Sequence, residues 1–231
     1  MEGSGGRLRP STDVSMKTFR AVVFDMDGVL ADSEPTYLEA VNDVLRPLGK
    51  SMTPELHQAI MGHGVEATWE VLIRELNLPG SVADYIPPYD RRLVELLSKL
   101  DAPLPGVVSL VTMLHDRRIP IAVASSSLMS WIDALLTGLG LRHAFDALAS
   151  ATEVEHPKPA PDLYLLAASK LGMPPGACIA IEDTPTGLQS AKAAGMFAVQ
   201  VRASSTAFPP LPEADLVLDT LEAFDLRLVG L

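Results

Sequence analysis

The sequence predicts an α/β protein that combines a doubly wound parallel sheet, a Rossmann-like core, with an inserted α-helical cap domain. Two patterns lead to this fold class. In the C-terminal half, short apolar runs rich in Val, Ile and Ala alternate with segments of helical periodicity, which is typical of repeated strand–helix units. Before that half, residues 35–100 show only helical periodicity. This long stretch separates one strand near the N-terminus from the others.

The core strands are expected at short apolar runs that stop at polar residues. The first covers residues 19–24 and ends at Asp25-Met26-Asp27-Gly28. Further strands are expected over 119–124, 145–149, 177–182 and 197–201, and helices over 107–117, 128–139, 161–171 and 185–194. Units of this kind form one parallel sheet with helices on both faces.

The cap is expected at residues 34–101, because apolar residues recur there at helical spacing with no convincing strand between them. Thr53-Pro54 is a typical helix start. The predicted core therefore comprises residues 16–33 and 102–231. Residues 1–15 are rich in Gly, Ser and Pro, and we expect them to form a disordered tail.

Composition restricts the possible partners. The 231 residues include 18 Lys and Arg against 29 Asp and Glu, a net charge of −11, which opposes binding to nucleic acid or to an anionic membrane.

Cys178, the single cysteine, lies in an apolar run, so we expect a buried thiol and no disulfide. No apolar stretch is long enough to span a membrane. Because the N-terminus also has no apolar signal-peptide core, we expect a cytoplasmic protein. We expect a monomer, since no long apolar patch or heptad run stands out.

Polar residues that carry chemistry follow the ends of the predicted strands. Because the carboxyl ends of parallel strands meet at one edge of the sheet, these residues are expected to lie in one crevice. They are Asp25, Asp27, Ser125, Ser126, Lys158, Glu182 and Asp183. Each segment alone is also typical of a solvated turn or a helix cap. Their order at the ends of successive strands favours a site.

The carboxylates of this set repel one another, so they either take up protons or hold a hard cation. Oxygen ligands without Cys or clustered His favour Mg²⁺ over zinc. Lys158 and Ser125 supply a positive charge and a hydroxyl donor, which suit the oxygens of a phosphoryl group. Asp25 and Asp27 are two positions apart, so on extended backbone both face one substrate. One can then attack phosphorus while the other moves protons.

Four segments resemble the four motifs of the haloacid dehalogenase-like hydrolase superfamily. They are Phe24 to Pro35, Val123 to Ser127, Lys158 to Asp162 and Ile181 to Gly187. The resemblance covers residues 17–220. It is greatest to the branch that contains β-phosphoglucomutase and phosphoglycolate-type phosphatases, which carry a helical cap after the first strand.

The resemblance implies a phosphatase that acts on a small phosphorylated metabolite, such as a sugar phosphate or phosphoglycolate, through an aspartyl-phosphate. It makes Asp25 the nucleophile and Asp27 the general acid and base. Ser125, Ser126 and Lys158 would bind the phosphoryl oxygens of the substrate.

The same resemblance implies a Mg²⁺ site. Asp25, the backbone carbonyl of Asp27 and Asp183 would bind the ion, with Glu182 as a further ligand or an outer-sphere partner. Family caps place a specificity loop near His63, which therefore either contacts the substrate or is an exposed loop histidine.

Departures from the family pattern separate the alternatives. Asp27 argues against the dehalogenases and the phosphonate-cleaving relatives, which lack this second loop Asp. β-Phosphoglucomutase carries a His where this sequence has Tyr37, and a Lys and an Arg where the cap has Met61 and Val65. We therefore favour hydrolysis over a phosphosugar mutase. A noncatalytic binding protein is the third hypothesis, and the intact set of reactive residues argues against it.

Overall fold

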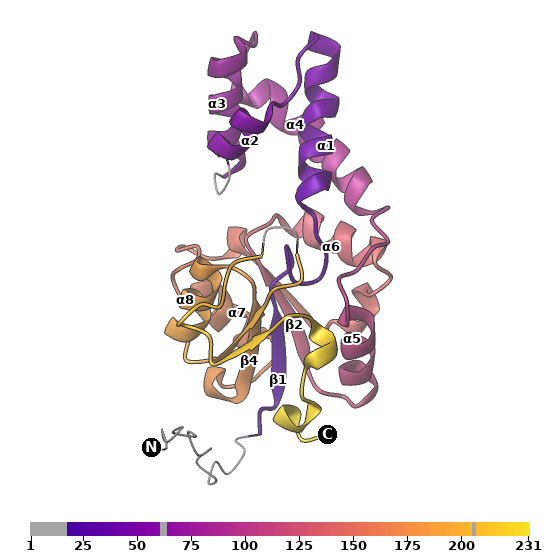
Figure 1. Ribbon diagram of the computed structural model, residues 1–231, viewed down its shortest axis with the longest axis vertical. Coiled ribbons are helices and arrows are strands. Elements are labelled where there is room, and N and C mark those ends of the chain that lie inside the picture. The colour runs from indigo at the N-terminus through magenta and orange to yellow at the C-terminus, as the bar shows by residue number, and fades with distance from the viewer. Residues whose placement is uncertain (1–17, 61–63, 205–206) are drawn as a thin grey trace, which may run out of the picture.

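The computed structural model describes residues 18–60, 64–204 and 207–231. The six strands of this part of the chain form one sheet in the order β3-β2-β1-β4-β5-β6, and every neighbouring pair is parallel. The strands are β1 (Ala21–Phe24), β2 (Ile121–Ser125), β3 (Ala147–Ser150), β4 (Cys178–Glu182), β5 (Phe197–Val201) and β6 (Leu216–Leu218). The chain runs outward from β1 through β2 and β3, then crosses to β4 and continues outward on the other side (Figure 1). A ligand is expected at such a reversal, beyond the carboxyl ends of β1 and β4.

The two faces of the sheet carry side chains of different size. The core helices are α5 (Val107–Asp116), α6 (Met129–Gly138), α7 (Asp162–Lys170) and α8 (Pro185–Ala193). Helices α5 and α6 share a hydrophobic cluster with large strand residues such as Val22 and Ile121. Helices α7 and α8 belong to a second cluster, on the face where smaller residues such as Ala122 and Ala180 predominate. Because side chains alternate along each strand, both clusters come from the same strands.

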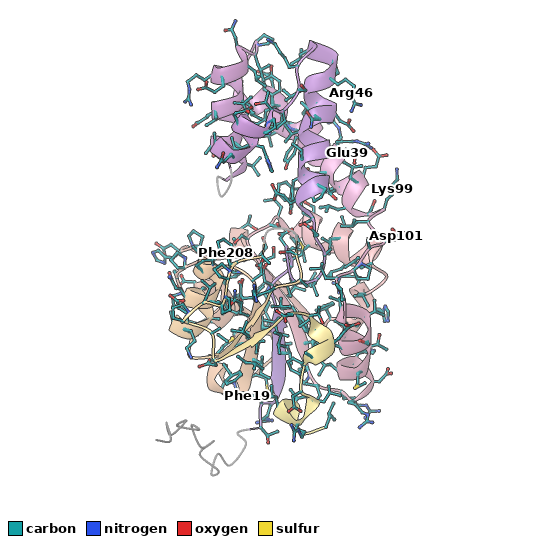
Figure 2. The ribbon with its side chains drawn as sticks, viewed as in Figure 1. Phe19, Glu39, Arg46, Lys99, Asp101 and Phe208 are labelled. Carbon is teal, nitrogen blue, oxygen red and sulfur yellow. The ribbon has the colours of Figure 1, made fainter. Side chains whose placement is uncertain are left out.

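Four helices of the described chain lie between β1 and α5 and gather beyond the carboxyl edge of the sheet (Figure 1). They are α1 (Glu34–Leu45), α2 (Pro54–Ile60), α3 (Val65–Leu76) and α4 (Val82–Leu97). Their packing is partly aromatic, since Trp69 of α3 stacks on Tyr85 of α4 with ring centroids 5.0 Å apart. The chain returns to the core near Lys99 and Asp101 (Figure 2).

Helix α4 connects the helical insert to the core, because it packs against α6. The indole Nε1 of Trp131 in α6 donates a hydrogen bond of 2.6 Å to Asp90 Oδ1 in α4. Gly138 at the end of α6 permits the chain that follows α4 to approach α6 closely. A Cβ atom at position 138 would lie only 2.8 Å from the carbonyl oxygen of Leu100. The insert is therefore fixed by packing as well as by its two chain connections.

The predicted fold class is confirmed, and the differences concern the ends of some strands and one further strand. The strand expected over 119–124 begins at Ile121, because Arg118 turns the chain with a positive φ of 56°. The strand expected over 145–149 begins at Ala147, after a 3₁₀ turn at Arg142–Ala144. Strand β6, which has three residues, was not predicted.

Of the other predictions, one is confirmed and the rest are not tested by the described residues. Cys178 is buried with a free thiol, as expected. No helix in the described ranges is long and apolar enough to cross a membrane. The predicted tail at 1–15 and the predicted cap contact His63 lie outside the described residues. The domain boundaries at 34 and 101 stay a prediction.

Candidate active site

The acids predicted from the strand ends meet at the carboxyl edge of the sheet. Asp25 follows β1, and its backbone N–H donates to the Ile181 carbonyl of β4 at 2.9 Å. Asp25, Glu182 and Asp183 are buried, and each places a carboxylate oxygen within 4.8 Å of the others. Ser125 at the end of neighbouring β2 is also buried. The topology thus brings together residues that are far apart in the sequence.

Lys158 is the cation among these acids. Its Nζ donates to Asp25 Oδ1 and to Glu182 Oε1, both at 2.6 Å, and to the Ala124 carbonyl at 3.1 Å. The side chain is only 7% exposed, and Nζ lies 5.1 Å from the ring centroid of Tyr164, within cation–π range. The buried ammonium therefore orients both carboxyl groups and offsets part of their charge.

Asp27 contacts a different set of partners. Ser33 and Tyr37 donate hydrogen bonds to its Oδ1, and Ser127 donates to its Oδ2, the last two at 3.1 Å. Among the described residues, its side chain is not part of the cluster that Asp25 forms with the acids after β4. The two acids of the first loop are therefore held in different surroundings, as distinct roles would require.

The two acids after β4 differ in their hydrogen bonding. Glu182 Oε1 accepts from Lys158 and from the Tyr164 hydroxyl at 2.7 Å, and Oε2 accepts from the Asp183 N–H at 3.1 Å and the Thr184 hydroxyl at 3.2 Å. Asp183 Oδ1 is buried and accepts no hydrogen bond from the described residues. An unpaired buried oxygen is costly, and a bound cation would satisfy it. Asp183 therefore fits a direct metal ligand, whereas Glu182 fits an outer-sphere partner.

Gly28 keeps space open beside Asp183. Its φ of +75° lies in the left-handed region that favours glycine, and a side chain here would overlap the Asp183 carboxyl group. The carboxylates of this cluster offer oxygen ligands only, which suit Mg²⁺ better than zinc. The site could thus hold a hard cation.

The pKa values of the clustered acids also favour a bound cation. Burial raises the pKa of Asp25 well above its usual range, and Lys158 counteracts only part of this rise. Burial, together with the charges of Glu182 and Asp27, raises the pKa of Asp183 to about 7. Burial alone would lower the pKa of Lys158, but Asp25 and Glu182 outweigh it and raise that pKa. One ammonium does not balance these carboxylates, so a further cation would stabilise their ionised forms.

The predicted phosphate-binding residues differ in their positions. The hydroxyl of buried Ser125 accepts a hydrogen bond from the Ser127 N–H at 3.0 Å. Lys158 lies beside the acids as described. Ser126 is exposed. The role of all three residues in phosphate binding stays a prediction.

Several residues that contact the acids were not predicted as site residues. They are Ser33, Tyr37, Ser127, Tyr164 and Thr184. Ser33 and Tyr37 are four positions apart at a helix start, so they share one face, and this spacing is a signal that sequence reasoning could have used. Tyr164 has no such signal, because a core tyrosine and a site tyrosine look alike in sequence.

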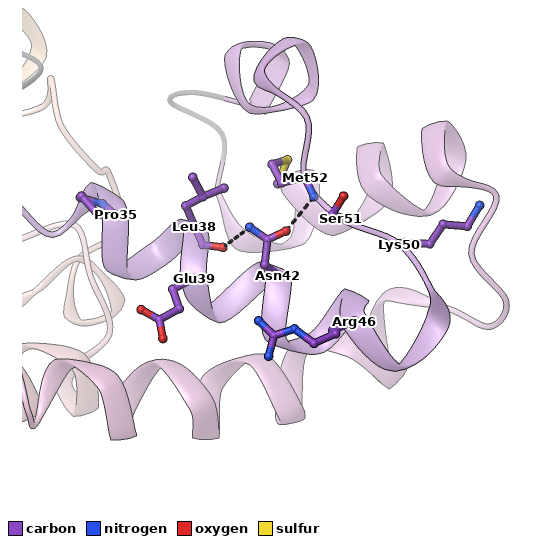
Figure 3. Close-up of a pocket in the computed structure, with 8 residues that line it drawn as sticks. All are labelled: Pro35, Leu38, Glu39, Asn42, Arg46, Lys50, Ser51 and Met52. Atoms are coloured by element: carbon purple, nitrogen blue, oxygen red, sulfur yellow. Dashed lines mark hydrogen bonds between the residues drawn. The ribbon is translucent and has the colours of Figure 1, made fainter.

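A separate pocket of about 540 Å³ lies on the helical insert, beside α1 and the segment before α2 (Figure 3). Asn42 within it donates to the Leu38 carbonyl at 3.0 Å and accepts from the Met52 N–H at 2.8 Å. None of the clustered acids lines this pocket. Its central amide therefore holds the chain before α2 in place and is not part of the candidate site.

Comparison with known proteins identifies the family. A family model of haloacid dehalogenase-like hydrolases matches residues 19–195. The chain belongs to the haloacid dehalogenase-like hydrolase family. It is 40% identical over 190 residues to fructose-1-phosphate phosphatase YqaB of Escherichia coli (strain K12), covering 80% of this chain and 97% of that protein.

Solved structures agree with this assignment. CbbY from Rhodobacter sphaeroides in complex with phosphate matches with a TM-score of 0.79 at 28% identity, covering 93% of this chain and 100% of that chain. A putative beta-phosphoglucomutase from Thermotoga maritima matches with a TM-score of 0.75 at 28% identity, covering 91% and 96%. The predicted superfamily and branch are confirmed, as is the predicted enzyme class of phosphoric monoester hydrolase.

Proposed function

We propose that this protein is a Mg²⁺-dependent phosphatase that hydrolyses a small phosphorylated carbohydrate through an aspartyl-phosphate on Asp25. The observation that carries this proposal is the arrangement around Asp25. Its carboxyl group is paired with the buried ammonium of Lys158 and lies in one cluster with Asp183, whose Oδ1 is buried without a hydrogen bond from the described residues. The phosphatase relative supports the reaction class and suggests a carbohydrate substrate.

In the first step, a carboxylate oxygen of Asp25 attacks the phosphorus atom, and the bond from phosphorus to the leaving oxygen breaks. Asp27 gives its proton to that oxygen, so the dephosphorylated carbohydrate leaves as an alcohol. In the second step, Asp27 takes a proton from water, whose oxygen attacks phosphorus. The bond between Asp25 and phosphorus then breaks, and inorganic phosphate leaves. Ser125 and Lys158 would hold the phosphoryl oxygens in both steps, and Lys158 would exchange one of its three present hydrogen bonds for this contact.

The metal site follows from the same residues. Asp25, Asp183 and the backbone carbonyl of Asp27 would hold Mg²⁺. Glu182 would be an outer-sphere partner that accepts hydrogen bonds from Lys158 and from the Asp183 N–H. When bound, Mg²⁺ would offset the negative charge that keeps an anionic substrate away from Asp25. The helical insert would act as the cap that excludes water and sets specificity.

The mutase alternative requires a group that holds a second phosphate. In this chain the family's mutase positions are Tyr37, Met61 and Val65, and none of these carries a positive charge. Four of the six Lys and Arg residues of the cap form ion pairs with acids of the insert itself, namely Arg46, Arg74, Arg92 and Lys99. These observations favour hydrolysis.

The test is phosphate release from a panel of phosphate monoesters, with and without Mg²⁺, beside the Asp25→Asn variant. We expect release from hexose phosphates that requires Mg²⁺ and is lost in the variant. Conversion of β-glucose 1-phosphate to the 6-phosphate without net phosphate release would favour the mutase instead. Release that persists in Asp25→Asn would refute the aspartyl-phosphate mechanism.

A further inference from the structure

The carboxyl group of Asp27 lies among three hydroxyl groups from separate positions of the chain. Ser33 precedes α1, Tyr37 lies in the first turns of α1, and Ser127 follows β2. Ser33 and Tyr37 donate to Oδ1, and Ser127 donates to Oδ2. The Tyr37 and Ser127 hydroxyl oxygens are themselves only 3.1 Å apart. Ser33 belongs to the same loop as Asp27, whereas Tyr37 and Ser127 lie outside it, so the orientation of this carboxyl group is set in part by other elements of the fold.

The hydrogen bonds leave one acceptor position of the carboxyl group open. A carboxylate has about four acceptor positions, two on each oxygen. Oδ1 accepts from two hydroxyls, while Oδ2 accepts from one of the described residues. The open position is therefore on Oδ2, and it is the place from which a proton can pass to a leaving group without breaking any of these hydrogen bonds.

The ring of Tyr37 is held from the core. It packs edge-on against Trp131 of α6, with centroids 6.0 Å apart. Trp131 is in turn fixed by its hydrogen bond of 2.6 Å to Asp90 and by an edge-on contact with Tyr89, with centroids 5.9 Å apart. The Tyr37 hydroxyl is thus presented to Asp27 by a rigid aromatic group that joins the insert to the core.

We infer that Tyr37 is a positioning residue that fixes the rotation of the Asp27 carboxyl group, so that the open position on Oδ2 faces the leaving oxygen. This inference rests on the proposed function, because it assigns a task within the proton transfer that Asp27 performs. Without the Tyr37 hydroxyl, a second acceptor position opens on Oδ1, and the carboxyl group gains freedom to carry its proton in an unproductive direction.

The test uses leaving groups that differ in their need for a proton. The sugar of an alkyl phosphate such as fructose 1-phosphate leaves as a strongly basic alkoxide unless its oxygen is protonated. By contrast, p-nitrophenyl phosphate releases a stable phenolate. In Tyr37→Phe, which keeps the ring, we expect kcat/KM to fall about tenfold or more for fructose 1-phosphate and less than about twofold for p-nitrophenyl phosphate. The value of kcat/KM is used because it reports the first phosphoryl transfer.

Two further variants make the test specific. Tyr85→Phe removes the hydroxyl of another buried tyrosine of the insert, one that donates to the Pro79 carbonyl, and we expect it to change neither substrate's kcat/KM. Ser127→Ala removes the donor to Oδ2 from a different segment, and we expect the same selective loss as in Tyr37→Phe. Thermal unfolding of each variant checks that it is folded, and Ser127→Ala keeps the test available if Tyr37→Phe does not fold.

A loss confined to the alkyl ester in both site variants is the expected result. An equal loss for both esters would show a merely structural role and overturn the inference, as would unchanged activity on both. Failure of the wild-type protein to release phosphate from either ester would instead overturn the proposed function, and this inference with it.

Discussion

Replacement of Lys158 by Met tests whether the buried ammonium holds the acids together. Lys158 forms two ion pairs of 2.6 Å, with Asp25 and with fully buried Glu182. Removing one partner of a buried ion pair costs about 3–5 kcal/mol, because the remaining charge stays buried without compensation. We expect a loss in the free energy of unfolding of about this size, measured by urea denaturation near neutral pH.

A surface lysine provides the matched control. Lys192 also pairs with an aspartate, since its Nζ lies 2.7 Å from Asp215 Oδ1, but its side chain is 40% exposed. Exposed pairs contribute about 0–1 kcal/mol, so Lys192→Met is expected to cost far less than Lys158→Met. Equal losses in the two variants would refute the argument.

The pH dependence of this loss has a definite sign. Burial raises the folded-state pKa of Asp25 above its unfolded value, so protonation of Asp25 adds stability at low pH that is lost as pH rises through the folded-state value. Without Lys158 that pKa rises further. The difference between Lys158→Met and the wild type should therefore be smaller at about pH 5 than at about pH 8.

Two further predictions concern Gly28, beside the proposed metal ligand Asp183, and the single thiol. Gly28→Ala and Gly49→Ala both place a side chain at positive φ, which alone should cost each variant about 1–2 kcal/mol. Only the side chain at position 28 also overlaps Asp183, which adds to its cost, whereas position 49 has no atom within 4 Å. Only Gly28→Ala should therefore lose the rise in Tm that added Mg²⁺ gives the wild type, and a full rise in this variant would contradict our placement of the metal. Burial raises the pKa of Cys178 from 9.0 to about 11, so its thiolate fraction near pH 8 is about a hundredfold lower and a thiol reagent should modify it far more slowly in the folded protein than in urea. Equal rates in the two states would show that the thiol is accessible.

The arrangement of the core was predictable because its strands have strong local signals. The run Phe197–Val201 is uninterrupted and apolar except for one Gln, and its predicted bounds match β5. By contrast, β6 has only three residues, two half-buried and one buried, and is too short for any periodicity. The first half of α4 contains Pro87 and Pro88, which usually argue against a helix interior. Packing against α6 and against Trp69 overrides that local preference.

Some residues of the candidate site were likewise predictable from the sequence, and others were not. Asp25, Lys158, Glu182 and Asp183 follow strand ends, so the topology alone predicts that they converge. Of the hydroxyls around Asp27, those of Tyr37 and Ser127 come from a helix and a loop whose approach depends on how the insert packs on the core. The spacing of Ser33 and Tyr37 indicates that they share a helix face, but the contact between the Tyr37 hydroxyl and Asp27 depends on the tertiary packing.

The most direct measurement of the central claim is detection of the covalent intermediate. The wild-type protein and Asp25→Asn are mixed with a hexose phosphate and Mg²⁺, quenched in acid during turnover, digested and examined by mass spectrometry. We expect one phosphoryl group on Asp25 of the wild type and none in the variant. Phosphate release without a phosphoryl group on Asp25, or with one on another residue, would contradict the account.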